Sequence, residues 1–272
     1  MKKKICLTTY FDGPFQEIGA LCSFSLHEYA KRHGYDVRIG HIRHTDRPVS
    51  WNKIPCIQGL FKEGYEFVLW VDADAVITDY DSKIEDIIED GKDMYIVNVA
   101  YAGGTIPSMG VFLLRNSSWS RELFEKVMNM AEYTYHPLWE NMAICHLFGL
   151  VRPLSSDLHE GLPPAIRDKE PNMKLLARVK WLPPSWNWVW PGSVLKIKAI
   201  IKHYPATPMH VRYYMMTRDL REAGLLSAKR FITAFLRVLL IHFIRIPFRM
   251  ITKNHFRVAR MMTRDALKLP FI

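Results

Sequence analysis

Hydrophobic positions in the first 150 residues follow two different spacings. Ile5 to Thr9 and Phe67 to Val71 are short apolar runs, and the second (FVLWV) shows no alternation, which is typical of a strand buried on both faces of a parallel sheet. Between these runs, apolar residues recur every three or four positions from Phe15 to His33, which predicts a helix. Gly34 then marks a turn into a second short strand.

The same alternation continues along the chain. Helices are predicted over residues 51–61 and 84–89, from Ser118 or Ser120 to Met130, and from about Pro137 to Leu147. Strands are predicted over residues 94–99 and 111–114. Strands that alternate with helices indicate an α/β domain with a mostly parallel central sheet.

The regular pattern ends between Val151 and His210. This stretch holds nine of the sixteen prolines and four of the eight tryptophans. It is predicted to be a loop-rich region close to whatever the sheet binds.

The net charge of +10 is concentrated at one end of the chain. Residues 221–272 contain eleven Lys and Arg against two Asp and Glu, or +9, and the other 220 residues carry 26 against 25, or +1. Arginines interrupt an apolar run over residues 229–250, and basic residues recur at helical spacing over 253–264. We expect two domains, residues 1–220 and a basic amphipathic tail of residues 221–272 that lies on an anionic membrane surface. A helix packed on protein is the alternative, and nucleic acid ranks third.

The chain offers little sign of export or of membrane spanning. The apolar run after the N-terminal lysines stops at Thr8 and Thr9, too soon for a signal peptide, and no apolar stretch reaches the roughly 18 residues that cross a bilayer. The four cysteines form no CxxC pair and are predicted to be buried thiols in a reducing compartment. We therefore expect a cytoplasmic protein, attached peripherally to the cytoplasmic face of a membrane.

The strongest candidate for chemistry is the VDADAV segment that follows the FVLWV strand. In extended backbone, Asp72 and Asp74 would project to one side and Ala73 to the other. Paired carboxylates at the carboxyl end of a parallel strand suit a divalent cation that also contacts phosphate oxygens. Two aspartates that merely cap a loop are the alternative. HAD phosphohydrolases share the D-x-D-x-[TV] pattern, but no convincing later acidic pair follows here.

Four blocks in this order resemble glycosyltransferase family 34, the galactosyl-, mannosyl- and xylosyltransferase group. They are WNKIPCIQGLFKEGYEFVLWVDADAVIT from Trp51, SMGVFLLRNSSWSRELF from Ser108, HPLWENMAICHLF from His136 and KHYPATP from Lys202. The resemblance implies a GT-A type, Rossmann-like domain. It also implies a metal-dependent enzyme that uses a nucleotide sugar.

The resemblance also assigns residues. Asp72, Asp74 and His203 would bind Mn²⁺ or Mg²⁺, with His210 competing for the histidine position, and Glu140 and Asn141 would lie beneath the anomeric carbon. Two positions depart from the family, Ser108 for Asn and Ala206 for Gly. Residues implied in donor binding are Thr8, Thr9, Tyr10, Lys53, Asp72, Ala73, Asp74, Ser108 and Gly110. For Lys53, an ordinary exposed helix lysine is the equal alternative to a phosphate contact.

The implied activity is transfer of a hexose of the galactose, glucose or mannose class from a UDP-linked donor, with retention of configuration. The acceptor would be a glycan or glycolipid, as in polysaccharide or lipopolysaccharide biosynthesis. Trp186, Trp188 or Trp190 could stack on acceptor sugars, with Trp186 and Trp188 the preferred candidates, although such residues more often complete a core. The alternatives are a phosphohydrolase and a membrane-bound sugar-nucleotide-binding protein without turnover.

Overall fold

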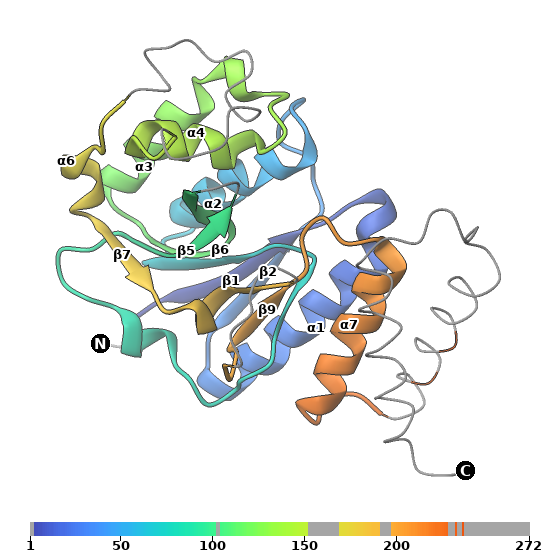
Figure 1. Cartoon of the computed structure of the whole chain (residues 1–272). Helices are drawn as coiled ribbons and strands as arrows, with labels where there is room; N and C mark the ends of the chain where they lie inside the picture. Colours follow the sequence, from blue (N-terminus) through green and yellow to red (C-terminus); the bar gives the residue numbers. More distant parts are fainter. Residues whose placement is uncertain are drawn as a thin grey trace, which may run out of the picture. The chain divides into compact units, whose positions relative to one another are not determined.

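The computed structural model describes residues 3–101, 104–151, 169–190 and 197–227, together with residues 232 and 236. The chain divides into two compact units, Met1–Pro205 and Ala206–Ile272. Figure 1 shows the layers of the first unit, a central sheet with helices on both sides.

Within the described part of the chain, the main sheet has six strands in the order β2-β1-β3-β6-β5-β7. Strand β1 is parallel to β2 and β3, and β5 is parallel to β7, whereas β6 is antiparallel to both of its neighbours. The predicted α/β class with a mostly parallel sheet is therefore confirmed. The strands are β1 (Ile5–Tyr10), β2 (Asp36–Gly40), β3 (Phe67–Val71), β5 (Met94–Tyr101), β6 (Gly104–Arg115) and β7 (Val179–Leu182).

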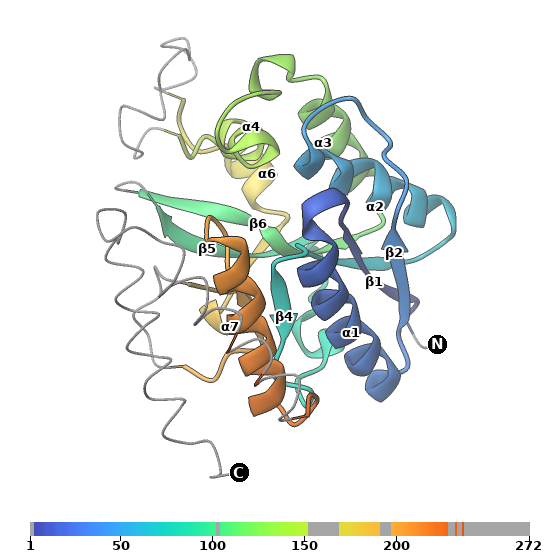
Figure 2. The same cartoon turned by 90° about the vertical axis from the view of Figure 1, so that its right-hand side faces the viewer.

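Helices cover both faces of this sheet. In Figures 1 and 2, α2, α3 and α4 lie on one face and α1 lies on the other. Gly34 ends α1 with a left-handed φ of 71°, a conformation that suits glycine. Among the described residues of the first unit, the α-helices are α1 (Gln16–His33), α2 (Lys53–Lys62), α3 (Ser118–Met128), α4 (Trp139–Phe148) and α6 (Met173–Leu176).

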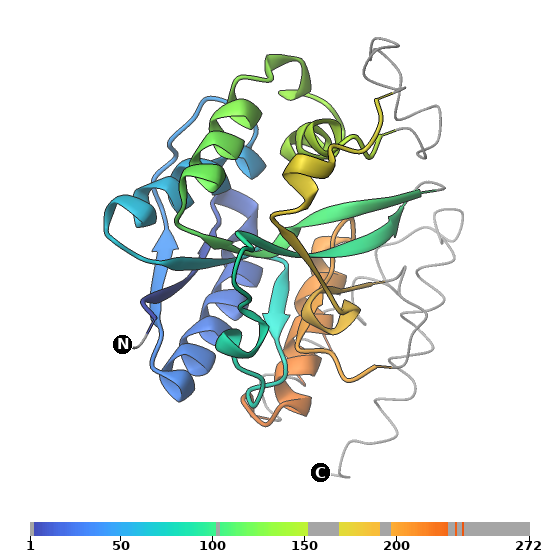
Figure 3. The same cartoon turned by 90° about the vertical axis from the view of Figure 1, so that its left-hand side faces the viewer.

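A second, smaller sheet has the order β4-β9-β8. Its strands are β4 (Ala75–Ile77), β8 (Trp188–Val189) and β9 (Ile201–His203). Strand β4 lies on the same side of the main sheet as α1 (Figures 2 and 3). Because β9 pairs with β4, the stretch predicted to be loop-rich is tied to the chain that follows β3.

Two predicted elements differ from the structure. The strand predicted over residues 111–114 extends over the whole of β6, because residues 104–107 pair with β5 in a hairpin. The predicted helix at residues 84–89 is a 3₁₀ turn, Ile84–Ile87. Further 3₁₀ turns are Gly13–Phe15, Val49–Asn52, Ala131–Tyr133 and Pro184–Asn187.

The second unit contains α7 (Met209–Glu222). Most of the predicted tail, residues 221–272, lies outside the described residues, so its helix and its membrane contact remain predictions. Among the helices described, none is long and apolar enough to cross a membrane. All four cysteines are free thiols. Cys6, Cys22 and Cys145 are buried as predicted, but Cys56 is only half-buried, so the prediction is wrong for that residue.

Candidate active site

The paired aspartates lie in a tight turn between β3 and β4. The Ala75 amide donates to the carbonyl oxygen of Asp72 at 3.0 Å, which closes the turn, and the Asp72 amide donates to the Gly110 carbonyl oxygen at 2.7 Å. The extended backbone that the sequence suggested here is therefore wrong. The turn nevertheless keeps both carboxylates close together at the carboxyl end of β3.

Strand β9 brings His203 to these aspartates. Ala75, the first residue of β4, pairs directly with His203, and the Tyr204 amide donates to the Asp74 carbonyl oxygen at 3.0 Å. His203 Nε2 lies 3.2 Å from Asp74 Oδ1. One ligand atom from each of Asp72, Asp74 and His203 falls within 4.8 Å of the others. The competing histidine, His210, belongs to α7 in the second unit.

The chemistry and spacing of these three side chains fit a divalent cation. Two carboxylates and an imidazole suit Mn²⁺, and carboxylates also suit Mg²⁺. Two atoms that bind one octahedral ion at about 2.1 Å and at right angles are about 3 Å apart. The distance of 3.2 Å between His203 Nε2 and Asp74 Oδ1 agrees with this geometry.

Gly110 gives the His203 ring its space. A Cβ atom added at Gly110 would lie 2.1 Å from His203 Cε1. The ring therefore packs directly on the backbone of β6, where a larger residue would displace it. Gly110 was predicted to contact the nucleotide-sugar donor, and that contact stays a prediction. In the structure, Gly110 lies directly against the His203 ring.

Asp72 is held from the other side by two donors. Trp70 Nε1 donates to Asp72 Oδ1 at 2.6 Å, and Lys53 Nζ lies 3.2 Å from the same oxygen. Both contacts use Oδ1, so Oδ2 is the oxygen that remains for a cation or for the nucleotide-sugar substrate. The Asp72 side chain is 30% exposed and can reach such a ligand.

Lys53 is buried, so the exposed-lysine alternative is wrong. Its side chain is only 2% exposed, and Nζ lies 2.7 Å from Glu140 Oε1 and donates to the Met109 carbonyl oxygen at 2.9 Å. With Asp72, these partners use all three N–H groups of the ammonium. A contact with donor phosphate would require one of these bonds to be given up.

The two buried partners have shifted pKa values. Burial opposes the charge of Lys53, but the carboxylates of Asp72 and Glu140 outweigh it and raise the pKa of Lys53 above its ordinary value. Burial raises the pKa of Glu140, and the neighbouring Lys53 ammonium only partly offsets this. The charges of the pair are thus mutually dependent.

Glu140 and Asn141, predicted to lie beneath the anomeric carbon, are both engaged in structure. Glu140 is 3% exposed and paired with Lys53. The Asn141 carboxamide accepts from the Met109 amide at 2.9 Å and donates to the Pro107 carbonyl oxygen at 2.9 Å, which joins α4 to β6. The chain enters α4 through Trp139, which has a φ of +43° and is 42% exposed. Such a backbone is costly for a bulky residue and is found most often near functional sites.

The other residues predicted to bind the nucleotide-sugar donor lie near the same strand ends. Thr8, Thr9, Tyr10 and Ala73 are all buried. Thr8 pairs with Trp70, which places the end of β1 beside the end of β3. The Tyr10 hydroxyl donates to Asp12 Oδ2 at 3.2 Å. Their contact with a nucleotide stays a prediction.

The predicted acceptor tryptophans differ in exposure. Trp186 is buried, which leaves little of its ring for a sugar, and Trp188 is half-buried in β8. Between them, Asn187 hydrogen bonds to both His203 and Ser108. Sequence reasoning missed Asn187, because a single amide between tryptophans carries no periodic or motif signal.

Ala206, which stands where the family often has glycine, has a φ of +50°. This left-handed conformation is the one that favours glycine. Ala206 therefore holds a backbone conformation that glycine would adopt more easily, at a cost of about 1 kcal/mol for the alanine side chain.

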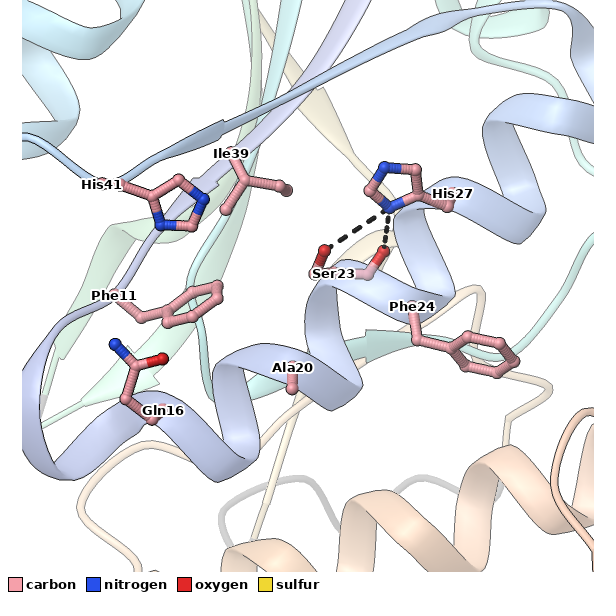
Figure 4. Close-up of a pocket in the computed structure, with 8 residues that line it drawn as sticks. All are labelled: Phe11, Gln16, Ala20, Ser23, Phe24, His27, Ile39 and His41. Atoms are coloured by element: carbon pink, nitrogen blue, oxygen red, sulfur yellow. Dashed lines mark hydrogen bonds between the residues drawn. The ribbon is translucent and has the colours of Figure 1, made fainter.

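A cavity of about 420 Å³ lies elsewhere, between α1 and the ends of β1 and β2 (Figure 4). Within it, the His27 ring contacts the carbonyl and hydroxyl oxygens of Ser23. None of the residues predicted for donor, metal or acceptor lines it, so we assign it no part in the donor site. Its lining residues are Phe11, Gln16, Ala20, Ser23, Phe24, His27, Ile39 and His41.

Comparison with solved structures identifies the class of fold. A glycosyltransferase involved in the glycosylation of the major capsid of PBCV-1 matches with a TM-score of 0.56 at 17% identity, over 78% of this chain and 98% of that one. The glycosyltransferase GlyE of Streptococcus pneumoniae TIGR4 matches with a TM-score of 0.55 at 11% identity, over 88% of this chain and 64% of that one. The first unit thus has the GT-A-like fold that the sequence predicted.

Comparison with sequences finds similarity to one family over part of the chain. Residues 25–97, from α1 into β5, match the model of the galactosyl transferase GMA12/MNN10 family, glycosyltransferase family 34. Galactomannan galactosyltransferase 1 of Cyamopsis tetragonoloba is 28% identical over 118 residues, which are 39% of this chain and 26% of the relative. The chain spans about a quarter of the length of the curated relatives that it matches. The predicted resemblance to this family is confirmed over this segment.

Proposed function

We propose that the protein is a metal-dependent glycosyltransferase that moves a hexose from a nucleoside diphosphate sugar to a glycan or glycolipid. The observation that carries this proposal is the cluster of Asp72, Asp74 and His203 at the carboxyl end of β3 in a GT-A-like fold. Open α/β sheets bind their ligands at this edge. The family match over residues 25–97, which includes both aspartates, supports the same reading.

The three side chains would hold Mn²⁺ or Mg²⁺. A bound divalent cation supplies positive charge that stabilises a departing diphosphate. The chain's own contribution is placement: the β3–β4 turn fixes Asp74, Lys53 and Trp70 orient Asp72, and Gly110 and β9 fix His203. These groups are already in position before a donor arrives, which lowers the cost of organising the site.

The finer assignments extend this proposal. A UDP-linked galactose, glucose or mannose is proposed as donor, with transfer under retention, and the name of the galactosyltransferase relative favours galactose among the three. Half-buried Trp188 and exposed Trp139 offer ring surface to an acceptor sugar, whereas Trp186 offers little.

Asp74→Ala tests the proposed function. We expect it to abolish Mn²⁺-dependent donor binding and transfer, measured by calorimetry and by sugar release from a panel of nucleotide sugars, while circular dichroism stays unchanged. Asp90→Ala, at an exposed aspartate remote in sequence from the cluster, should behave like the wild type. Full activity in excess EDTA would overturn the proposal.

The same assay separates the alternative functions. Release of inorganic phosphate from simple phosphate esters, without sugar transfer, would favour a phosphohydrolase. Donor and metal binding without hydrolysis or transfer would favour a binding protein that lacks turnover.

We also propose that residues 221–272 attach the protein to an anionic membrane surface on its cytoplasmic side. The support is the charge division, +9 in this segment against +1 elsewhere. Each basic residue near such a surface contributes about 1 kcal/mol. Full-length protein should sediment with anionic vesicles and much less with neutral ones, and protein ending at Leu220 should stay in the supernatant. Equal sedimentation of both chains would assign the tail to protein contacts instead.

A further inference from the structure

His203 lies between two oxygen acceptors. Its Nε2 is 3.2 Å from Asp74 Oδ1, and its Nδ1 is 3.2 Å from Asn187 Oδ1. A histidine can bind a metal only through a nitrogen that carries no proton. Which nitrogen holds the proton therefore decides whether His203 can bind a cation beside Asp74.

Asn187 is placed to determine which nitrogen of His203 carries the proton. It is 1% exposed and ends a 3₁₀ turn, Pro184–Asn187, directly before β8. Its Nδ2 donates to Ser108 Oγ on β6 at 2.9 Å, which leaves Oδ1 directed at the His203 ring. The carboxamide thus joins β6 to β9 across the floor of the site.

We propose that Asn187 is a positioning residue that keeps the proton of the His203 ring on Nδ1, so that Nε2 is available to a cation. An oxygen acceptor at Nδ1 can be satisfied only by an N–H group there. Hydrogen bonds to the second nitrogen generally fix the tautomer and orientation of a metal-binding histidine. This inference rests on the proposed metal site, but it concerns a residue outside the ligand set.

The acceptor at Asn187 matters because Asp74 competes with it. Without Asn187 Oδ1, the Asp74 carboxylate would be the stronger remaining acceptor and would draw the proton to Nε2, the nitrogen that must stay bare. If the carboxamide were turned by 180°, its NH₂ group would face Nδ1 and favour the same unproductive tautomer. The Ser108 hydroxyl can accept from the Asn187 NH₂ group or donate to its oxygen, so the ring spectrum described below distinguishes the two orientations.

Ser108 supports Asn187 in this arrangement. It is a departure from the asparagine of the family, and its buried hydroxyl contacts Asn187. Ser108 therefore acts on the cation site through Asn187 and His203. Gly110, two residues along β6, completes the support by leaving room for the ring.

The first experiment reads the ring directly in the whole protein. Long-range ¹H–¹⁵N spectra of protein with ¹⁵N-labelled histidine distinguish protonated from bare ring nitrogens, and the spectrum of His203→Gln assigns the His203 signals. At pH 8, with and without Mg²⁺, Nδ1 of His203 should carry a proton. A bare Nδ1 in the wild type would overturn the inference, and this measurement needs no substitution at Asn187.

The second experiment compares three variants for Mn²⁺ affinity by calorimetry and for the ring spectrum. Asn187→Ala should weaken Mn²⁺ binding about 10-fold or more and move the proton to Nε2. Asn187→Asp keeps an oxygen acceptor and should restore the proton on Nδ1 and an affinity within about 3-fold of the wild type. Asn116→Ala is the matched control, because its carboxamide makes two backbone bonds at the other end of β6.

The outcomes separate this inference from the proposed function. An unchanged spectrum and Mn²⁺ affinity in Asn187→Ala, or an equal loss in Asn187→Ala and Asn116→Ala, would overturn the positioning role. If the wild type binds no Mn²⁺, the proposed metal site fails, and the position of the proton in the wild type and in Asn187→Asp still decides the inference.

Discussion

The negative charges of Asp72 and Asp74, the two aspartates of the β3–β4 turn, are balanced in different ways. On one side, Asp72 faces a resident cation, the buried ammonium of Lys53, which is also paired with Glu140. On the other side, Asp74 faces His203, whose ring does not require a permanent charge. The negative charge of Asp72 is thus balanced by Lys53 within the chain, whereas the negative charge of Asp74 would be balanced by a bound cation.

This difference separates stability from binding. A buried ion pair that loses one partner leaves an uncompensated charge in the core, which is strongly destabilising. A carboxylate that awaits a cation gains stability only when the cation binds. Substitutions on the Lys53 side should therefore act mainly on folding, and substitutions on the His203 side mainly on metal and donor binding.

The largest effect is expected for Lys53→Met. The substitution keeps the length of the side chain but leaves the buried Glu140 carboxylate without its cation, so the free energy of unfolding should fall by about 3–5 kcal/mol. Urea denaturation of the metal-free protein measures this change. Asp74→Ala, measured in parallel, should cost much less stability.

The double variant Lys53→Met with Glu140→Met sharpens this result. Removing both buried charges should recover a large part of the stability lost in the single variant, because well-packed apolar residues can replace a buried pair. Losses that simply add would show that Lys53 and Glu140 are not energetically coupled.

Gly110→Ala probes the His203 side. The new Cβ would lie 2.1 Å from the His203 ring, so the ring must move away from Asp74. We expect a stability loss of about 1–3 kcal/mol together with a marked loss of Mn²⁺ affinity.

Gly59→Ala is the matched control for this change. A Cβ at Gly59, within α2, meets nothing within 4 Å, and alanine favours helices by about 1 kcal/mol over glycine. It should leave Mn²⁺ affinity unchanged and maintain or raise stability. Wild-type Mn²⁺ affinity in Gly110→Ala would contradict the close packing of His203 on β6.

Some elements of the fold follow from local patterns in the sequence, and others do not. The unbroken apolar run of β3 and the helical spacing of α1 are local signals, and both elements were found where expected. Strands β8 and β9 have two and three residues, too short for any period to appear, and they form only because they pair in a second sheet.

The site shows the same limit. Asp72 and Asp74 stand in a motif, and the resemblance pointed to His203, so the three candidate ligands were named from the sequence. The bond from Asn187 to His203 and the pairing of Lys53 with Glu140 join residues that are 16 and 87 positions apart. Nothing local in the sequence marks such contacts, because they arise from the packing of α2, α4 and β9 against the main sheet.

The smallest predicted effect is a pH dependence that belongs to the Lys53 side alone. Burial raises the pKa of Glu140 in the folded protein above its value in the unfolded chain. As the pH rises through the interval between these two values, the unfolded chain releases its proton first, so the free energy of unfolding falls. Glu140→Gln removes the titrating group and should abolish this part of the fall, so that the stability of the variant rises relative to that of the wild type as the pH rises from about 4 toward neutrality.

Glu125→Gln, at an exposed glutamate on α3, provides the control and should follow the wild-type curve. Urea denaturation of the metal-free proteins at closely spaced pH values measures the difference. Parallel curves for the wild type and Glu140→Gln would show that Lys53 keeps the Glu140 carboxylate charged at no cost, and the two sides of the turn would then differ less than their contacts suggest.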